Sequence, residues 1–191
     1  MGLKLNLGCG RSPAAGWVNV DQASLPGVDV VADLDACRTM PLPFADDSVS
    51  HFQMLHVLEH IKDTLALMQE LHRIAEPNAL LRIQSPYGSS DDAYEDPTHC
   101  QRLFANSFAH FAQPTYHRAD YGYRGDWEVE QLVLTVRKSE NEGLSVDEIA
   151  RKVRELRNIV VEMIVLLKAI KPIRPADRAL QQGITVNLQL V

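Results

Sequence analysis

The chain has 191 residues, of which 46% are hydrophobic and 23% are charged, and its formal net charge is −6. This length and composition are ordinary for a globular protein and predict one well-buried domain with a short extension. The charge is uneven, because residues 1–143 hold 11 Lys and Arg against 20 Asp and Glu. The main body is therefore expected to repel nucleic-acid phosphates, which argues against a nucleic-acid partner.

The cysteines and the hydropathy of the sequence indicate in which cellular compartment the protein is expected. The three cysteines form no Cys-x-x-Cys pair, and a strand pattern begins directly after Met1, where a signal peptide would lie. We therefore expect a cytoplasmic protein. The longest apolar stretch, residues 159–170, is interrupted by Glu162 and Lys168 and is shorter than the roughly 20 residues that a membrane span requires. No membrane partner is predicted.

The first half of the chain alternates strand patterns with loops. Strands are predicted at about 3–7, 17–21, 28–33, 49–55 and 79–83. Asp63 is placed to cap a helix whose apolar residues keep to one face until Pro77 and Asn78 stop it. Strand, helix and strand in this order predict parallel pairing by a right-handed crossover. Only six residues, 11–16, separate the first two strands, so no full crossover helix fits there.

The second half predicts an acidic loop over 87–101, a short helix over 106–112 and a strand over 128–136 that ends the sheet in a hairpin. The capping-box spacing of Ser145 and Glu148 predicts a helix, and we expect it to run to Lys171. Its apolar residues recur in steps of four and three, as in a heptad seam: Ile149, Val153, Leu156, Val160, Met163, Leu167 and Ile170. A clean period of two over 184–190 predicts a terminal strand.

Together these elements predict an α/β layered domain over residues 1–138 and an extension of helix and strand over residues 144–191. The apolar seam of the extension must be covered either by the domain or by a second copy. We favour a homodimer through the helix, because a heptad seam suits helix pairing and a terminal strand can extend a neighbouring sheet.

The most informative segment is the turn that follows the first strand. Leu5, Asn6 and Leu7 run into Gly8-Cys9-Gly10, and Asp21 closes the second strand. Two glycines directly after a buried strand let the backbone approach a ligand where a Cβ would collide. An acidic residue at the end of the next strand can bind a ribose. This pattern predicts a nucleotide-type site.

The chain resembles the class I S-adenosylmethionine-dependent methyltransferases over about residues 3–138. The resemblance rests on Leu-Asn-Leu-Gly-Cys-Gly at 5–10, Asp21, Ala-Asp-Leu at 32–34, Leu-Pro-Phe at 42–44 with Asp-Ser at 47–48, and His-Val-Leu-Glu-His at 56–60. It implies a Rossmann-like, mostly parallel sheet with an antiparallel final strand, here followed by the long helix and terminal strand. It also implies S-adenosyl-L-methionine as the cofactor and a small-molecule acceptor, with a sugar or glycan precursor as the hypothesis for its class.

The resemblance implies a role for each matched residue. The cofactor-binding set is Asn6, Gly8, Cys9, Gly10, Asp21, Asp33, Leu34 and His56. The two glycines would lie under the methionine part of the cofactor, Asp21 would accept both ribose hydroxyls, and Asp33 with Leu34 would face the adenine. Asp21 as a simple turn cap and Asp35 as the adenine partner are the alternatives. Asn6 replaces the acidic residue that is commoner in the family, which removes a charge near the cofactor's ammonium group.

A hydroxyl acceptor also needs a base, and the loop after the fifth strand should hang over the carboxyl edge of the sheet. His99 is our candidate, because imidazole titrates near neutral pH. A solvated loop histidine is the simpler alternative. His60 is expected to be structural.

Three other functions match parts of the sequence. Residues 56–60 match the H-x-x-E-H zinc signature, but the motif follows a strand and the chain is very short for such a peptidase, so no metal is predicted. A nicotinamide-dependent dehydrogenase is disfavoured, because Pro13 stands where the third glycine of the fingerprint would be and no crossover helix follows. The remaining alternative is a catalytically silent cofactor-binding module that serves assembly through its carboxy-terminal helix.

Overall fold

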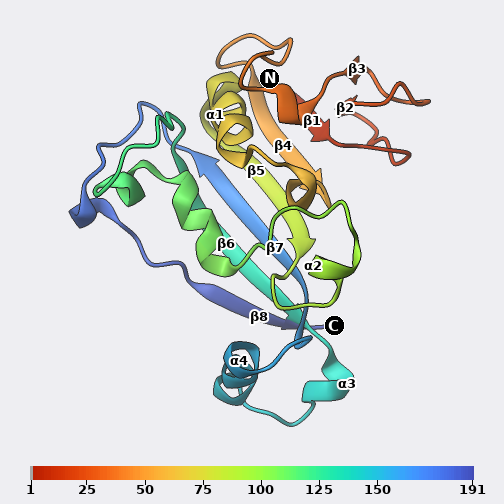
Figure 1. The fold of residues 1–191 in the computed structure, drawn as a ribbon, viewed down its shortest axis with the longest axis vertical. Coiled ribbons are helices and arrows are strands. Elements are labelled where there is room, and N and C mark those ends of the chain that lie inside the picture. The colour runs from red at the N-terminus through yellow and green to blue at the C-terminus, as the bar shows by residue number, and fades with distance from the viewer. Residues whose placement is uncertain (1) are drawn as a thin grey trace.

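The computed structural model describes residues 2–191 and contains one eight-stranded sheet (Figure 1). The strands are β1 (Leu3–Leu7), β2 (Val18–Asp21), β3 (Val30–Val31), β4 (Val49–Leu55), β5 (Ala75–Pro86), β6 (Trp127–Val136), β7 (Val160–Ala169) and β8 (Val186–Leu190). Their order across the sheet is β3-β2-β1-β4-β5-β7-β6-β8. Strand β7 is antiparallel to both of its neighbours, and every other pair is parallel. The predicted mostly parallel α/β fold is therefore confirmed.

The helices are short, and most are single turns. They are η1 (Leu34–Ala36), η2 (Leu58–His60), α1 (Thr64–Ile74), α2 (Asp92–Glu95), η3 (Ala105–Phe111), η4 (Gln113–Tyr116), α3 (Lys138–Asn141), α4 (Val146–Glu155) and η5 (Arg178–Leu180). The short helix predicted over 106–112 is the 3-10 helix η3. As predicted, no helix lies between β1 and β2. No helix within residues 2–191 combines the length and apolarity needed to cross a membrane.

Helix α1 joins β4 to β5 as predicted. The Asp63 carboxylate accepts a hydrogen bond from the Ala66 N–H at 3.1 Å, which caps the amino-terminal end. The helix ends at Ile74, and β5 begins with the next residue, so the strand starts before Pro77. Strands β4 and β5 pair in parallel, which agrees with a crossover through α1.

Trp127 at the start of β6 couples the sheet to this helix. Its ring is fully buried and meets the ring of Phe52 edge-on at 6.0 Å, while its Nε1–H donates to the Met68 carbonyl at 2.9 Å. Pairing of the indole N–H removes the cost of burying a polar group in the core. The contact fixes α1 against β4 and β6.

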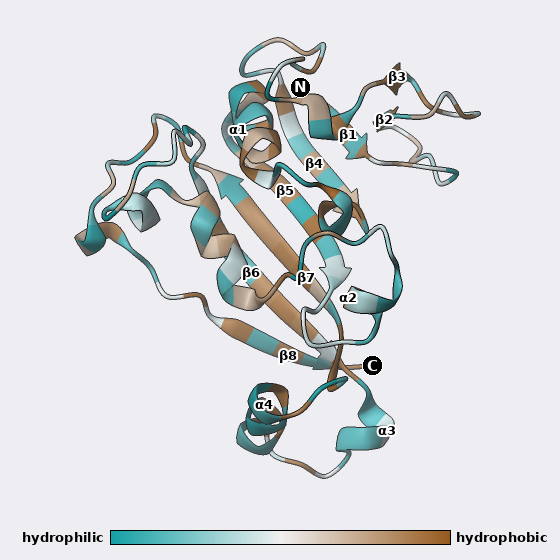
Figure 2. Cartoon of the chain, in the orientation of Figure 1, coloured by the Kyte–Doolittle hydropathy of each residue, from teal (hydrophilic) through white to brown (hydrophobic). Residues whose placement is uncertain are grey.

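The helix predicted over residues 145–171 is wrong in its second half. Helix α4 begins with the predicted capping box at Ser145 and ends at Glu155. Asn158 then takes a positive φ of 59°, and residues 160–169 form β7 between β5 and β6. Figure 2 shows that β6 and β7 are largely apolar, whereas α4 is mostly hydrophilic. The other apolar residues of β7 are half-buried, and the buried ones, which do not form a helical seam, are Val160, Met163, Val165, Leu167 and Ala169.

The terminal strand is confirmed as β8, which pairs in parallel with β6. The Val191 N–H donates to the Val136 carbonyl at 3.0 Å, and the Lys138 N–H donates to the Val191 carbonyl at 2.8 Å. The last residues of the chain are thereby tied to the end of β6. Segment 144–191 thus contributes β7 and β8 to the same sheet as the first half of the chain.

Candidate functional site

A cavity of about 670 Å³ opens beyond the carboxyl ends of β1, β2 and β4. Its lining consists of Gly8, Asp21, Gln22, Ala32, Asp33, Leu34, Asp35, His56, Val57, His60, Ile61, Lys62, Pro97, Thr98 and Cys100. This volume lies within the range of roughly 300–1,000 Å³ typical of small-molecule sites. Its position at the carboxyl edge of parallel strands is where open α/β sheets bind ligands.

The turn after β1 brings backbone to this cavity. Gly8 and Gly10 have φ angles of 62° and 53°, a region that residues with a Cβ seldom occupy. A Cβ on Gly8 would lie 2.6 Å from Cγ2 of Val57, so no larger residue fits there. Gly10 does not line the cavity, but its N–H donates to Oδ2 of Asp21 at 2.7 Å. The turn is therefore shaped by its glycines and fixed by Asp21.

Asp21 both holds the turn and lines the cavity. Its Oδ2 accepts the Gly10 N–H, and its Oδ1 accepts the Ala23 N–H at 2.9 Å. A carboxylate has about four lone-pair positions, so two remain after these bonds. The turn-capping alternative and the ribose-binding role are thus compatible in one side chain.

Asp33 and Asp35 have different surroundings. Oδ1 of Asp35 accepts the N–H of Lys62 at 2.7 Å and that of Asp63 at 3.3 Å, which ties η1 to the segment before α1. Oδ1 of Asp33 accepts the Asp35 N–H at 2.9 Å, as the cap of η1. Both carboxylates line the cavity beside Leu34. Asp33 carries fewer backbone contacts, which makes it the more available partner for a ligand.

Like Gly10, two other predicted residues, Asn6 and Cys9, lie outside the lining. Asn6 is buried, and its amide donates to Oδ1 of Asn19 at 2.9 Å and to the Ser12 carbonyl at 3.3 Å. Its Oδ1 accepts from Nε2 of Gln53 at 3.0 Å. These hydrogen bonds stabilise the turn after β1. Cys9 is also buried, and burial raises the pKa of its thiol.

His56 follows β4 with a positive φ of 55° and points into a pair of carboxylates. Its Nε2 lies 2.9 Å from Oε1 of Glu162, and its Nδ1 lies 3.4 Å from Oε1 of Glu59. These contacts, with Glu59 first, raise the pKa of His56. Glu162 is in β7, so a strand from the second half of the chain reaches the site. Sequence reasoning missed this residue because it placed Glu162 on a helix.

The loop after β5 folds over the carboxyl edge as predicted, and Pro97, Thr98 and Cys100 enter the lining. His99 itself does not line the cavity. Its side chain is 9% exposed, and its ring packs edge-on against the ring of His60, with 4.7 Å between the centroids. His99, the predicted base, therefore packs behind the cavity wall. His60, which was expected to be structural, lines the cavity.

Several lining residues carried no sequence signal of their own. Gln22, Ile61 and Lys62 follow predicted elements directly and enter the lining because those elements converge. Thr98 and Cys100 lie in the acidic loop from which the candidate base was chosen. These residues lie at the site because separate segments meet there, and no sequence pattern marks them.

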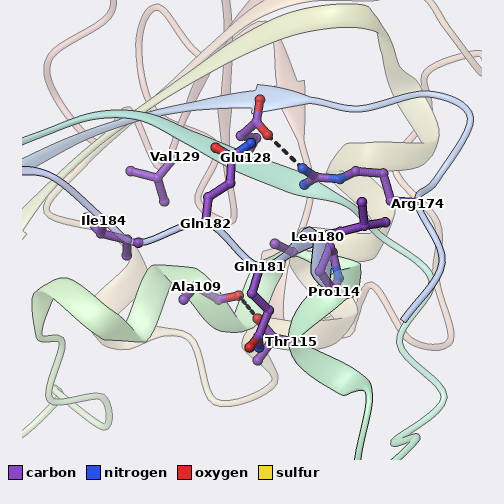
Figure 3. Close-up of a pocket in the computed structure, with 12 residues that line it drawn as sticks. Ala109, Pro114, Thr115, Glu128, Val129, Arg174, Leu180, Gln181, Gln182 and Ile184 are labelled. Atoms are coloured by element: carbon purple, nitrogen blue, oxygen red, sulfur yellow. Dashed lines mark hydrogen bonds and ion pairs between the residues drawn. The ribbon is translucent and has the colours of Figure 1, made fainter. Parts of the chain in front are cut away.

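A second cavity of about 340 Å³ lies between η4, β6 and the segment before β8 (Figure 3). Its charged residues are already paired, because Arg174 donates to Oε1 of Glu128 at 2.6 Å. The Thr115 hydroxyl donates to the Ala109 carbonyl, also at 2.6 Å. Figure 3 shows both interactions as dashed lines between lining residues. The first cavity, in which the Asp21 and Asp33 carboxylates retain acceptor positions, is the candidate functional site.

Part of the chain matches a known family model. A family model described as a methyltransferase domain matches residues 5–83, which include the turn after β1, Asp21, Asp33 and His56. A search of curated proteins found no significant match.

The solved structures that resemble the chain share its fold. A S-adenosylmethionine-dependent methyltransferase from Archaeoglobus fulgidus has a TM-score of 0.58 and 17% identity, over 88% of this chain and 86% of that one. A putative sarcosine dimethylglycine methyltransferase from Galdieria sulphuraria has a TM-score of 0.56 and 13% identity, over 90% and 79%. A putative methyltransferase from Haloferax volcanii, solved in complex with the Trm112 methyltransferase activator, has a TM-score of 0.54 and 15% identity, over 91% and 84%.

Proposed function

We propose that the chain transfers a methyl group from S-adenosylmethionine to a small polar acceptor, because a methyltransferase-domain model matches residues 5–83 and a solved S-adenosylmethionine-dependent methyltransferase shares its fold. The observation that carries the proposal is the 670 Å³ cavity at the carboxyl ends of β1, β2 and β4, with Asp21 in its wall. A sugar or glycan precursor is the acceptor class that we propose to test first.

The residues of the cavity suit the cofactor. Gly8 leaves room for the ligand's methionine part, Asp21 retains two acceptor positions for ribose hydroxyls, and Asp33 with Leu34 offers a polar and an apolar surface to an adenine. A carboxylate that accepts from hydroxyls forms charge-assisted bonds, about twice as strong as neutral ones. When bound, the cofactor supplies an activated methyl group on a sulfonium sulfur, and the protein supplies alignment.

The acceptor would approach from the side of His56, His60 and Thr98, because the opposite side is occupied by the ribose and adenine groups in this arrangement. His60 and Thr98 offer a ring nitrogen and a hydroxyl, which suit an acceptor with several hydroxyl groups, whereas both ring nitrogens of His56 face carboxylates. Holding acceptor and donor in a near-attack geometry is worth roughly 7–11 kcal/mol in favourable cases. Alignment by this wall would be the main catalytic contribution of the chain.

The experiment that tests the proposal is calorimetric titration with S-adenosylmethionine, S-adenosylhomocysteine and NAD. We expect the first two to bind and NAD not to bind. Asp21→Ala should weaken binding by about 10- to 100-fold, since it removes charge-assisted hydrogen bonds to the ligand. Asp147→Ala, which removes an exposed carboxylate in α4, is the matched control and should bind as wild type.

The result decides between the proposal and its alternative. Binding followed by methylation in a screen of hydroxylated acceptors supports the enzyme. Binding without turnover on any acceptor would favour the silent cofactor-binding module. The assembly role of that module was assigned to a long carboxy-terminal helix, and residues 160–169 of that helix are instead strand β7. A protein that binds neither ligand would overturn both.

The homodimer and the cytoplasmic location remain proposals. Within residues 2–191 the outer edge of β8 has no partner strand, so β8 replaces the predicted helix as the element through which a second copy would pair. Light scattering of the intact chain tests this pairing. Cys9, Cys37 and Cys100 are free thiols, which fits a reducing compartment.

A further inference from the structure

Three side chains with metal-ligating atoms meet beside the cofactor cavity. Glu59 and His60 belong to η2, and His99 belongs to the loop after β5. One ligand atom from each lies within 4.8 Å of the other two. His60 lines the cavity, and the other two lie directly behind it. The proposed binding of the cofactor uses none of the three.

Glu59 is a buried carboxylate without adequate partners. Its residue is 2% exposed, and within residues 2–191 neither carboxylate oxygen has a hydrogen-bond donor. The nearest cationic group is His56, whose Nδ1 lies 3.4 Å from Oε1 without hydrogen-bond geometry. Burial of a carboxylate whose oxygens accept no hydrogen bond is costly, even beside a histidine. A bound cation at these oxygens would remove that cost.

The hydrogen bonds of His60 define which ring nitrogen is available. The Thr98 hydroxyl donates its only proton to Oδ1 of Asp96 at 2.6 Å, so its oxygen can only accept from His60 Nδ1, which lies 2.9 Å away. Nδ1 of His60 therefore carries the proton, and Nε2 keeps its lone pair. Metal-ligating histidines are commonly oriented by such a bond from the other nitrogen.

His99 is held beside Glu59 by backbone contacts. The N–H groups of Cys100 and Gln101 both donate to the Glu59 carbonyl, at 2.8 and 3.0 Å. Nδ1 of His99 is buried and has no hydrogen-bond partner within residues 2–191, while Nε2 lies 3.9 Å from a carboxylate oxygen of Asp96. The buried, unpaired Nδ1 is thus the available ligand atom of this ring.

We propose that the Glu59 carboxylate, Nε2 of His60 and Nδ1 of His99 bind one divalent transition-metal ion, of which Zn²⁺ is the type. Two imidazoles and one carboxylate with an open position are a common zinc donor set, whereas Mg²⁺ and Ca²⁺ prefer oxygen ligands. Zn–N and Zn–O bonds are about 2.0–2.2 Å long, so two ligand atoms of a tetrahedral zinc site lie about 3.4 Å from one another. The ligand atoms, now within 4.8 Å of one another, would therefore approach by up to about 1.4 Å on binding.

This set differs from the zinc-peptidase signature in residues 56–60. That signature places two histidines on one face of a helix, but η2 covers only Leu58–His60, and His56 precedes it with a positive φ. Nε2 of His56 is occupied by Glu162. The third ligand is His99, which lies 39 residues beyond His60 in the sequence.

The open position of the ion would face the cavity, because His60, Thr98 and Cys100 form that part of its wall. On this point the inference rests on the proposed function: the ion would bind an acceptor oxygen and lower the pKa of a hydroxyl there. No general base would then be needed from His99, whose lone pair would be used by the metal.

The test is metal binding to the tag-free, chelator-treated protein. We expect one Co²⁺ per chain by visible d–d absorption and one Zn²⁺ by calorimetry. Glu59→Gln and His99→Ala should each weaken binding by about 100-fold or more, since each removes a ligand. Thr98→Val, which keeps the side-chain shape and removes the acceptor of His60 Nδ1–H, should weaken it by about 10- to 100-fold. His110→Ala, at an exposed histidine of η3, should leave it unchanged.

Two results would overturn the inference: no stoichiometric ion, or an ion whose affinity is unchanged in Glu59→Gln, His99→Ala and Thr98→Val. Titration of the metal-free protein with S-adenosylhomocysteine separates this question from the proposed function. Binding of the nucleotide without any metal site would refute only the ion. Binding of the ion without the nucleotide would refute only the methyltransferase.

Discussion

Gly8 and Gly10 share a left-handed backbone conformation but have different surroundings. Gly8 has no room for a Cβ, because the methyl groups of Val57 lie 2.6 and 2.9 Å from the position that it would occupy. Around Gly10 no atom lies within 4 Å of that position. An alanine at Gly10 would therefore destabilise the fold only through its backbone conformation, whereas an alanine at Gly8 would also collide with Val57.

We expect Gly8→Ala to be the more damaging substitution. Gly10→Ala should lower the free energy of unfolding by about 1–2 kcal/mol, the cost of a left-handed residue with a Cβ. Gly8→Ala carries the same cost and a further 1–3 kcal/mol or so from overpacking against Val57. Urea denaturation of the two variants measures the difference. Equal losses of stability would show that Val57 moves aside freely.

The sequence predicts the role of a residue where the local backbone geometry can be satisfied by only one or a few amino-acid types. Gly8 follows a buried strand at a tight turn, and Asp21 ends the adjacent strand, so both roles depend on a few neighbouring residues. Glu162 could not be found in this way, because its contact with His56 spans 106 positions. Asn6 matched a family position, yet its amide is used by Asn19 and the backbone.

Strand β7 shows that hydrophobic periodicity alone does not distinguish a strand from a helix. Buried and half-buried residues alternate along most of β7, and because both sets are mostly apolar the strand reads as a nearly continuous apolar run, which cannot be distinguished from a buried helix by period alone. The steps of four and three from Ile149 to Ile170 therefore continued across a helix, a turn at Asn158 and a strand. The β-branched residues Val160, Val161, Ile164 and Val165 were the available signal for a strand.

The segment after β7 is fixed to β6 by one buried ion pair. Asp126 is fully buried and accepts from Nε and an Nη of Arg174 at 2.9 and 2.8 Å, and from the Arg174 N–H at 2.9 Å. The Gln113 N–H donates to the same carboxylate at 3.1 Å. These contacts, first the hydrogen bond to Asp126, raise the pKa of Arg174. The pair connects the end of β7, η4 and the start of β6.

Arg174→Met should lower the free energy of unfolding by about 3–5 kcal/mol, because it leaves the Asp126 carboxylate buried without its cation. Arg124→Met is the matched control. Arg124 pairs with Asp120 at 2.9 Å on the surface, where both side chains are more than half exposed, so its loss should cost at most about 1 kcal/mol. Chemical denaturation of both variants tests the contrast. A loss below 1 kcal/mol for Arg174→Met would show that water or the remaining hydrogen bonds to Asp126 compensate for the missing cation.

On the scale of the whole molecule, the two halves of the chain form a single sheet. The chain begins at β1 and ends beside β6 and β8, and the two termini lie at opposite ends of the strands (Figure 1). Strand β7 joins β5 to β6, so a chain that ended at Gly143 would lack the strand between them. Stability is therefore a property of the complete chain, and contacts between α1 and the end of β7 contribute to it.

His72 makes such a contact and gives the global stability a dependence on pH. It lies in α1, is 5% exposed, and its Nε2–H donates to the Ile170 carbonyl at 3.0 Å. Burial lowers the pKa of His72 below its ordinary value of 6.5. The unfolded chain therefore binds a proton near pH 6.5, while the folded chain binds it only at a lower pH.

The sign of the effect follows from this difference. Between pH 6.5 and the lowered pKa the unfolded state holds more protons, so the free energy of unfolding falls as the pH falls, with a limiting slope of about 1.4 kcal/mol per pH unit for one group. His72→Gln keeps a donor for Ile170 and does not titrate. From pH 7.5 to 5.5 the wild type should therefore lose more stability than His72→Gln when both are measured by urea denaturation. Parallel curves for the two proteins would show that His72 becomes protonated in the fold as readily as in water, and that its burial is relieved by local opening of α1 from the sheet.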